Sequence, residues 1–153
     1  MDNIKIRRAK SSDIDALMPQ ILIFEEQHAV YDGGYLTDKY RENAKEDLKR
    51  DIKKKYFWVA ELNKKVIGFV KAEISDFHSD RLIIVDLFVE ADFRKQGIGA
   101  KLISYVEESF KKEKGIKEAC LWVAKQNINA EGFYKGLGFK FQEDIWKKYL
   151  KEL

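Results

Sequence analysis

The stretch from Phe93 to Leu102, "FRKQGIGAKL", decides the fold and raises the main functional question of this sequence. Two basic residues, Arg94 and Lys95, come directly before two glycines that are separated by one residue. An apolar residue then recurs every fourth position, which predicts an amphipathic helix from Gly97 to about Lys114. Glycine costs about 1 kcal/mol relative to alanine inside a helix, so two glycines in its first turn require an explanation.

The patterns on either side of this stretch predict the element order β-α-α-β-β-β-α-β-α-β-β. The strand–helix–strand unit around the glycines implies one parallel pair inside a mostly antiparallel sheet with flanking helices, an α/β (α+β) fold. We expect a capping box at Ser12 and Asp15, and a bend or break at Pro19. The expected strands are residues 3–9, 56–62, 65–75, 81–90, 117–124, 139–142 and 145–150, and the expected helices are residues 12–28, 37–54, 97–114 and 128–135.

The composition limits the class of protein. The length of 153 residues fits a single domain, 1–153, and a hydrophobic content of 45% is enough for a packed core. Positive and negative charges nearly cancel at +3, which argues against a nucleic-acid-binding protein. The longest apolar runs are too short to span a membrane. A single cysteine, Cys120, and an N-terminus without an apolar signal core predict a cytoplasmic protein.

The glycines at the start of the helix have two explanations. Free N–H groups and the positive end of the helix dipole bind anions, and absent side chains let a phosphate approach the backbone. Alternatively, the glycines only allow a tight turn into close helix–sheet packing. Two known phosphate loops do not fit, because no glycine lies five positions before Gly99 and Leu102 replaces the third glycine of the dinucleotide fingerprint.

The sequence resembles the GNAT superfamily of acetyl-CoA-dependent N-acetyltransferases. Residues Arg94 to Ala100 resemble its Q/R-x-x-G-x-G/A motif, and "VDLFVEADF" before them resembles the strand and turn that lead into it. "NINAEGFYKGLGF" resembles the second signature of the family. The strong resemblance covers about Val85 to Phe139, and the element order extends it more weakly. The signature residues are Asn127, Ala130, Tyr134, Gly138 and Phe139.

The resemblance implies a site for acetyl-CoA. Arg94 and Lys95 would lie close to the pyrophosphate, and the backbone of the preceding strand would pair with the pantetheine arm. An amide from Phe88 or Val89 would polarise the thioester carbonyl. Asn127 would contact the pantetheine, cap the helix at Ile128, or do both. The pyrophosphate would bind the amides of Gln96, Gly97, Ile98, Gly99 and Ala100, and the pantetheine would pair with Leu87, Phe88 and Val89.

The resemblance also implies an acid and a base. Tyr134 would protonate the departing thiolate, because a phenol is protonated at neutral pH; the alternative is aromatic packing. Glu73 or Asp86 would accept the proton of the amine, and the alternative for each is an ion pair or exposure to solvent. His28 would line the acceptor site or have a surface or capping role. Trp122 stands where ribosomal-protein N-terminal acetyltransferases carry a glutamate, which argues against that subgroup.

The sequence therefore predicts acetyl transfer to a primary amine by direct attack in a ternary complex. Glu25, Glu26 and Asp32 alternate with tyrosines, which suits a cationic acceptor such as a polyamine, an aminoglycoside or a lysine side chain; a solvated helix end is the alternative. Neither histidine has a metal-ligand spacing, so no metal is expected. Dimers are common in the superfamily, so a homodimer is an expectation. The rival hypothesis is a non-catalytic acyl-CoA-binding sensor.

Overall fold

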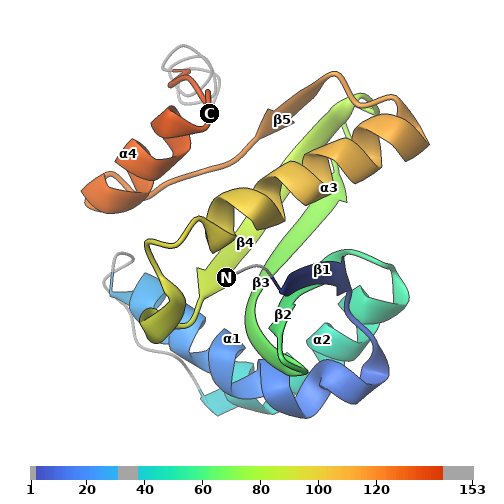
Figure 1. Ribbon diagram of the computed structural model, residues 1–153, viewed down its shortest axis with the longest axis vertical. Helices are drawn as coiled ribbons and strands as arrows, with labels where there is room; N and C mark the ends of the chain where they lie inside the picture. Colours follow the sequence, from blue (N-terminus) through green and yellow to red (C-terminus); the bar gives the residue numbers. More distant parts are fainter. Residues whose placement is uncertain (1–2, 31–37, 143–153) are drawn as a thin grey trace. The chain divides into compact units, whose positions relative to one another are not determined.

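The computed structural model describes residues 3–30 and 38–142 (Figure 1). The chain divides into two compact units, Met1–Trp122 and Val123–Leu153. Among the described residues, the first unit contains a five-stranded sheet and three α-helices, and the second contains α4 (Ile128–Gly136). Of the expected final hairpin, residues 139–142 belong to neither helix nor strand, and residues 145–150 lie outside the described residues. A strand requires a hydrogen-bonded partner, and the partner expected for residues 139–142 was residues 145–150.

The sheet confirms the predicted mixed arrangement. Its strands follow one another in chain order, and every pair is antiparallel except the last, β4 with β5. The final strand is much shorter than the expected residues 117–124, because it remains paired with β4 only over its first residues. The strands are β1 (Ile4–Arg8), β2 (Phe57–Leu62), β3 (Lys65–Ile74), β4 (Arg81–Val89) and β5 (Glu118–Cys120).

Helices cover both faces of this sheet (Figure 1). Phe57 packs in one apolar cluster with α1 (Ile14–Ala29) and α2 (Asp38–Lys53), whereas the next residue, Trp58, contacts Phe110 of α3 at 5.5 Å between ring centroids. Because successive strand residues point to opposite faces, α1 and α2 lie on one face and α3 (Ile98–Lys114) on the other.

No helix in the described ranges combines the length and the hydropathy needed to cross a bilayer.

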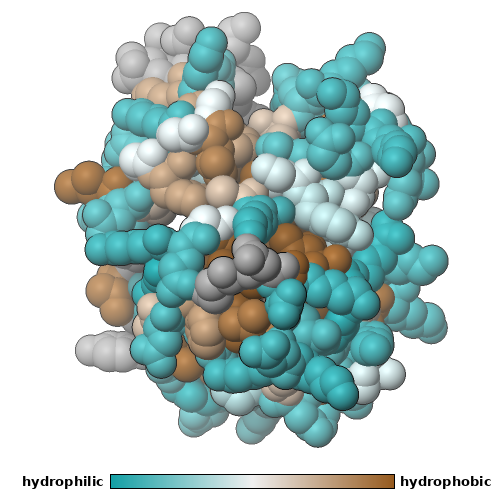
Figure 2. Space-filling view, viewed as in Figure 1, coloured by the Kyte–Doolittle hydropathy of each residue, from teal (hydrophilic) through white to brown (hydrophobic). Residues whose placement is uncertain are grey.

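The surface between α3 and β1 is apolar. A hollow of about 500 Å³ lies there, and Figure 2 shows apolar surface in the middle of this face with polar side chains around it. Its lining contains one charged residue, Lys101, and no acid–base pair, so this hollow does not offer proton-transfer chemistry. The lining residues are Ile4, Ile6, Ala100, Lys101, Ser104 and Tyr105.

The start of α1 differs from the expected capping box. A short 3-10 helix, Ser11–Asp13, precedes it, and the carboxylate of Asp13 accepts a hydrogen bond of 2.8 Å from the backbone N–H of Lys10. Asp13 thus takes the part expected of Asp15, but at the start of the 3-10 helix and three residues after Lys10, whereas its side chain makes no capping bond to α1. Pro19 does not break α1, which continues through it to Ala29.

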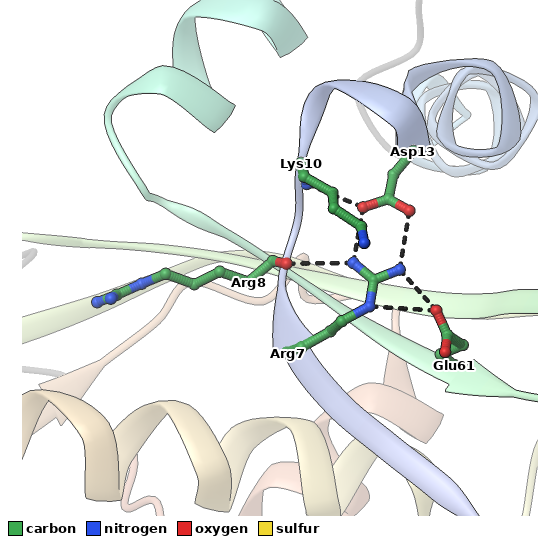
Figure 3. A network of polar contacts seen from close by, with 5 residues as sticks. All are labelled: Arg7, Arg8, Lys10, Asp13 and Glu61. Carbon is green, nitrogen blue, oxygen red and sulfur yellow. Dashed lines mark hydrogen bonds and ion pairs between the residues drawn. The ribbon is translucent and has the colours of Figure 1, made fainter. Parts of the chain in front are cut away.

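Arg7 of β1 connects three segments through one guanidinium group (Figure 3). It donates hydrogen bonds of 2.8 and 2.9 Å to the two carboxylate oxygens of Asp13, and two of 2.6 and 3.1 Å to one carboxylate oxygen of Glu61 of β2. These contacts raise the pKa of Arg7 and, together with the Lys10 amide, lower the pKa of the buried Asp13 carboxyl. The network thus holds the β1–α1 connection against β2.

Replacing Arg7 with leucine should lower the free energy of unfolding by about 2 to 3 kcal/mol, because Asp13 would remain buried without its cation. Arg8→Leu is the matched control: its partner Glu113 is exposed, so the loss should stay below about 1 kcal/mol. Urea unfolding at pH 7 measures both. Because the pKa of Asp13 is lower in the folded protein than in the unfolded chain, its ionised form stabilises the fold at pH values above the ordinary carboxyl pKa. This contribution is lost as the pH falls through the pKa of the folded state. Equal losses for both variants would contradict the role of Arg7.

Candidate active site

Within the described part of the chain, the end of β4 has an edge without a strand partner. Parallel pairing with β5 involves only Arg81, Leu82 and Ile83 on the β4 side, whereas β4 continues to Val89. Among the described residues, Ile84–Val89 therefore pair with β3 alone. This segment includes the three residues whose backbone was expected to bind a pantetheine arm.

The backbone N–H groups of this segment alternate between its two edges. The N–H of Glu90 donates to the Ile67 carbonyl of β3 at 2.9 Å. Because successive strand residues direct their N–H groups to opposite edges, the N–H groups of Val89 and Leu87 face the unpaired edge, and that of Phe88 faces β3. The alternation favours Val89 over Phe88 for polarising a bound thioester.

A β-bulge turns Asp86 toward the helices α1 and α2. Lys71 pairs with Asp86 and Ala72 pairs with Ile84, which leaves Val85 without an opposite residue. The extra residue shifts the alternation, so that Ile84 faces α3 while Asp86 lies on the opposite face beside Lys71. An uninterrupted strand would place both side chains on one face.

Asp86 lies in a polar cluster at this face. Burial and the nearby negative charge of Glu25 raise the pKa of Asp86 to about 6, although Lys71 and His28 oppose the shift. The Nζ atom of Lys71 lies 2.8 Å from a carboxylate oxygen of the buried Asp51, so its charge is shared with that group. Asp86 can therefore be protonated or ionised close to neutral pH.

Side chains from α1 and α2 complete this cluster. Burial and a hydrogen bond with Glu25 raise the pKa of Tyr40. The Nδ1 atom of His28 lies 2.9 Å from the Phe24 carbonyl and must donate to it, since a carbonyl only accepts. The structure thus gives His28 a backbone contact, in keeping with the surface or capping role considered for it, and also places it near Asp86. Glu73 is half-buried and shares the face of Lys71, two residues further along β3.

The turn into α3 exposes backbone donors. Lys95 and Gly97 both have left-handed backbones, with φ of 60° and 79°. The first helical bond runs from the Lys101 N–H to the Gly97 carbonyl at 3.0 Å, so the N–H groups of Ile98, Gly99 and Ala100 lack partners within the helix. Residues 94–97 are exposed. This geometry suits an anion, as the first of the two explanations for the glycines requires.

Arg94 connects this turn to β4. Its Nε donates to the Val89 carbonyl at 2.8 Å, and its guanidinium carbon lies 5.6 Å from the centre of the Phe88 ring. Nε is one of five N–H donors on an arginine. Arg94 can therefore hold the end of β4 while it contributes positive charge to the turn.

The second unit contains the two remaining predicted residues. The side chain of Asn127 accepts a hydrogen bond of 3.2 Å from the Ala130 N–H, which confirms its capping role for α4. Tyr134 is half-buried, and its ring lies 5.1 Å from that of Phe133 and 5.9 Å from that of Phe139. The aromatic packing that was considered for Tyr134 is thus present, and it is compatible with a role for the hydroxyl.

The sequence analysis missed Lys71 and Asp51 as neighbours of Asp86. A lysine inside the apolar run "VIGFVKAEI" was the available signal, because an isolated charge in a buried strand needs a partner. Its partner on α2 is remote in sequence and could not be identified. Among the residues that the structure describes, no group of three His, Cys, Asp or Glu side chains could hold a metal ion.

The unpaired amides at the start of α3 and the edge of β4 beyond Ile83 suit an extended anionic ligand. Comparison with known proteins matches residues 22–139 to the model of the acetyltransferase (GNAT) family. An uncharacterized N-acetyltransferase of Archaeoglobus fulgidus is 31% identical over 145 residues, which is 86% of this chain and 89% of that protein. The chain belongs to the GNAT acetyltransferase family, as its motifs predicted.

Two further relatives support this assignment. An uncharacterized N-acetyltransferase of Methanocaldococcus jannaschii is 34% identical over 110 residues, 63% of this chain and 45% of that protein. The solved PaiA N-acetyltransferase of Thermoplasma acidophilum in complex with coenzyme A is 25% identical, with a TM-score of 0.75 and 92% of each chain covered. The matched region thus spans less than half of the Methanocaldococcus relative but most of the solved structure.

Proposed function

We propose that this chain transfers an acetyl group from acetyl-CoA to a primary amine, and that residues 1–153 act as one catalytic domain. One observation carries the proposal: the edge of β4 that no described strand pairs is followed, after a short 3-10 helix (Ala91–Phe93), by a turn whose amides and basic side chains suit a pyrophosphate. The family membership and the relatives named N-acetyltransferases support it. The cytoplasmic location and the homodimer stay predictions of the sequence.

The chain's own residues divide the work of binding. The amides of Ile98, Gly99 and Ala100 would hold the pyrophosphate, with Arg94 and Lys95 adding positive charge. The Leu87 and Val89 backbone would pair with the pantetheine as an added strand. Acetyl-CoA supplies an activated thioester when it is bound.

Three groups would serve the transfer itself. Asp86 would accept the proton that the amine loses as it attacks, and the Val89 N–H would donate to the thioester oxygen. Tyr134 would donate its phenolic proton to the departing sulfur.

Burial raises the pKa of the Cys120 thiol, which keeps it protonated and a poor nucleophile. This supports direct transfer rather than a covalent acetyl-cysteine.

The acceptor would be a cationic amine. Glu25 and Asp86 place two carboxyl groups near each other, and Tyr40 adds an aromatic ring on the same side of the sheet. Such a set attracts an ammonium group, which Asp86 can then help to deprotonate. Polyamines, aminoglycosides and lysine side chains share this chemistry.

The proposal is tested by following CoA release from acetyl-CoA over a panel of polyamines, aminoglycosides and lysine peptides. We expect at least one amine to increase the rate in a saturable manner. A protein that binds acetyl-CoA but responds to no amine would support the sensor hypothesis. A panel that is silent with acetyl-CoA but active with a longer acyl-CoA would change the donor.

Gly97→Ala should weaken CoA binding by about tenfold, equivalent to about 1.4 kcal/mol. A left-handed backbone is strained for alanine, and the added Cβ would project into open space beside the anion-binding amides. Gly115→Ala is the matched control, because it has φ of 65° at the other end of α3. Calorimetric titration with CoA should show a loss for the first variant alone, and equal losses would exclude a specific effect at the turn.

A further inference from the structure

The end of β4 lies unusually close to β3. A Cβ atom built on Gly68 would be 2.6 Å from the Phe88 carbonyl oxygen and 3.3 Å from the Val89 Cα atom. The first distance is below the 3.0 Å that real Cβ atoms keep, and the atom it meets belongs to the backbone. No side-chain rotation can relieve this contact, so any other residue at position 68 requires β3 and β4 to shift relative to each other.

The close approach occurs between two irregularities of the sheet. Ala60 pairs with Gly68 and Glu61 with Val66, so Ile67 is an extra residue on β3, and Val85 is an extra residue on β4. The segment from Asp86 to Val89 lies between these two bulges. Bulges re-aim side chains and occur next to active sites. The position of this segment therefore depends on more than the regular hydrogen bonds between β3 and β4.

A second contact fixes the same end of β4 from α1. The buried Gln20 donates through Nε2 to the Val66 carbonyl at 2.9 Å and to the Glu90 carboxylate at 3.0 Å. Glu90 follows Val89 directly, and its other carboxylate oxygen lies 2.9 Å from Lys65. Gln20 thus connects α1 to the residues that flank the close approach on both strands.

We propose that Gly68 is a positioning residue for the CoA-binding edge of β4. Its missing side chain lets β4 approach β3, and this approach sets where the Leu87 and Val89 amides lie on the opposite edge. Gly68 itself contacts no substrate in this account. The inference rests on the proposed function, because the displaced amides matter only if they pair with a pantetheine arm.

Two ligands separate this role from a general loss of structure. CoA carries the pantetheine arm, whereas 3′-phosphoadenosine 5′-diphosphate lacks it and would engage the turn and α3 alone. Gly68→Ala should weaken CoA binding by about tenfold or more, the effect of losing two ordinary hydrogen bonds to the displaced amides. Binding of the fragment should change by less than about twofold.

Calorimetric titration of both ligands into wild type, Gly68→Ala and Gly115→Ala decides the question. Gly115→Ala controls for lost stability and should leave the ratio of the two affinities unchanged. Gln20→Met keeps the length of the side chain but removes both hydrogen bonds, so it should lower CoA affinity in the same selective way. It is the second variant if Gly68→Ala fails to fold.

Each outcome has a separate meaning. Equal weakening of CoA and the fragment, or no weakening of either, would overturn the role of Gly68. If wild-type protein binds the fragment but shows no gain from the pantetheine arm, both the inference and the proposed use of β4 are wrong. If wild type binds neither ligand, the proposed function itself fails.

Discussion

Asp86→Asn will lower kcat/KM by about a hundredfold or more, the usual effect of removing a general base. Asparagine has nearly the same shape, so it keeps the packing beside Lys71 but cannot accept a proton. The pKa of about 6 predicts the pH dependence: wild-type kcat/KM rises as Asp86 ionises through this range and reaches its full contribution above it. The kcat/KM of the variant should lack this rise and should increase only as the amine acceptor loses its proton at higher pH.

Initial rates from pH 5 to about 9 with the best amine of the panel check this expectation. Glu46→Gln on the surface of α2 is the control, because its carboxylate is exposed and forms an ion pair with Lys49. If Glu73→Gln instead removes the rise near pH 6, the base is Glu73. A rise that persists in the Asp86 variant would exclude Asp86.

Tyr134→Phe will lower kcat by about a hundredfold while CoA binding stays within about twofold. The ring keeps its contacts with Phe133 and Phe139, so only the hydroxyl is lost. A leaving thiolate without a proton donor departs more slowly. The defect should shrink above the pKa of a free thiol, because an unprotonated thiolate is then the stable product.

Phe133→Leu is the matched control for Tyr134, since it disturbs the same aromatic packing without removing a hydroxyl. Steady-state kinetics and CoA titration of the two variants separate chemistry from packing. Equal defects in both variants, or a Tyr134 variant with normal kcat, would contradict the role of the phenol as an acid.

Local patterns predicted the elements well. The four-residue spacing after Gly97 located α3, and Gly115 ends it with a left-handed backbone, as a C-terminal glycine should. The motif also located the turn, because the positive φ of Gly97 is a local property of the chain. These features depend on neighbours in sequence, so a single sequence reveals them.

The site geometry could not be predicted in the same way. Alternation in "LIIVDLFV" places Ile84 and Asp86 on one face, yet the bulge at Val85 separates them. Register and bulges depend on the partner strand, which is chosen by tertiary packing. The ion pairs of Arg7 with Asp13 and Glu61 were missed for the same reason, since Glu61 lies on the neighbouring strand β2.

The central claim is direct transfer of acetyl from bound acetyl-CoA to an amine. Intact-mass spectrometry of the protein, incubated with acetyl-CoA alone and then with amine, tests it most directly. Direct transfer leaves the protein unmodified in both samples and produces an acetylated amine only in the second. An acetylated protein that forms without amine and then loses its acetyl group to the amine would contradict direct transfer. Absence of any acetylated amine would contradict the proposed function.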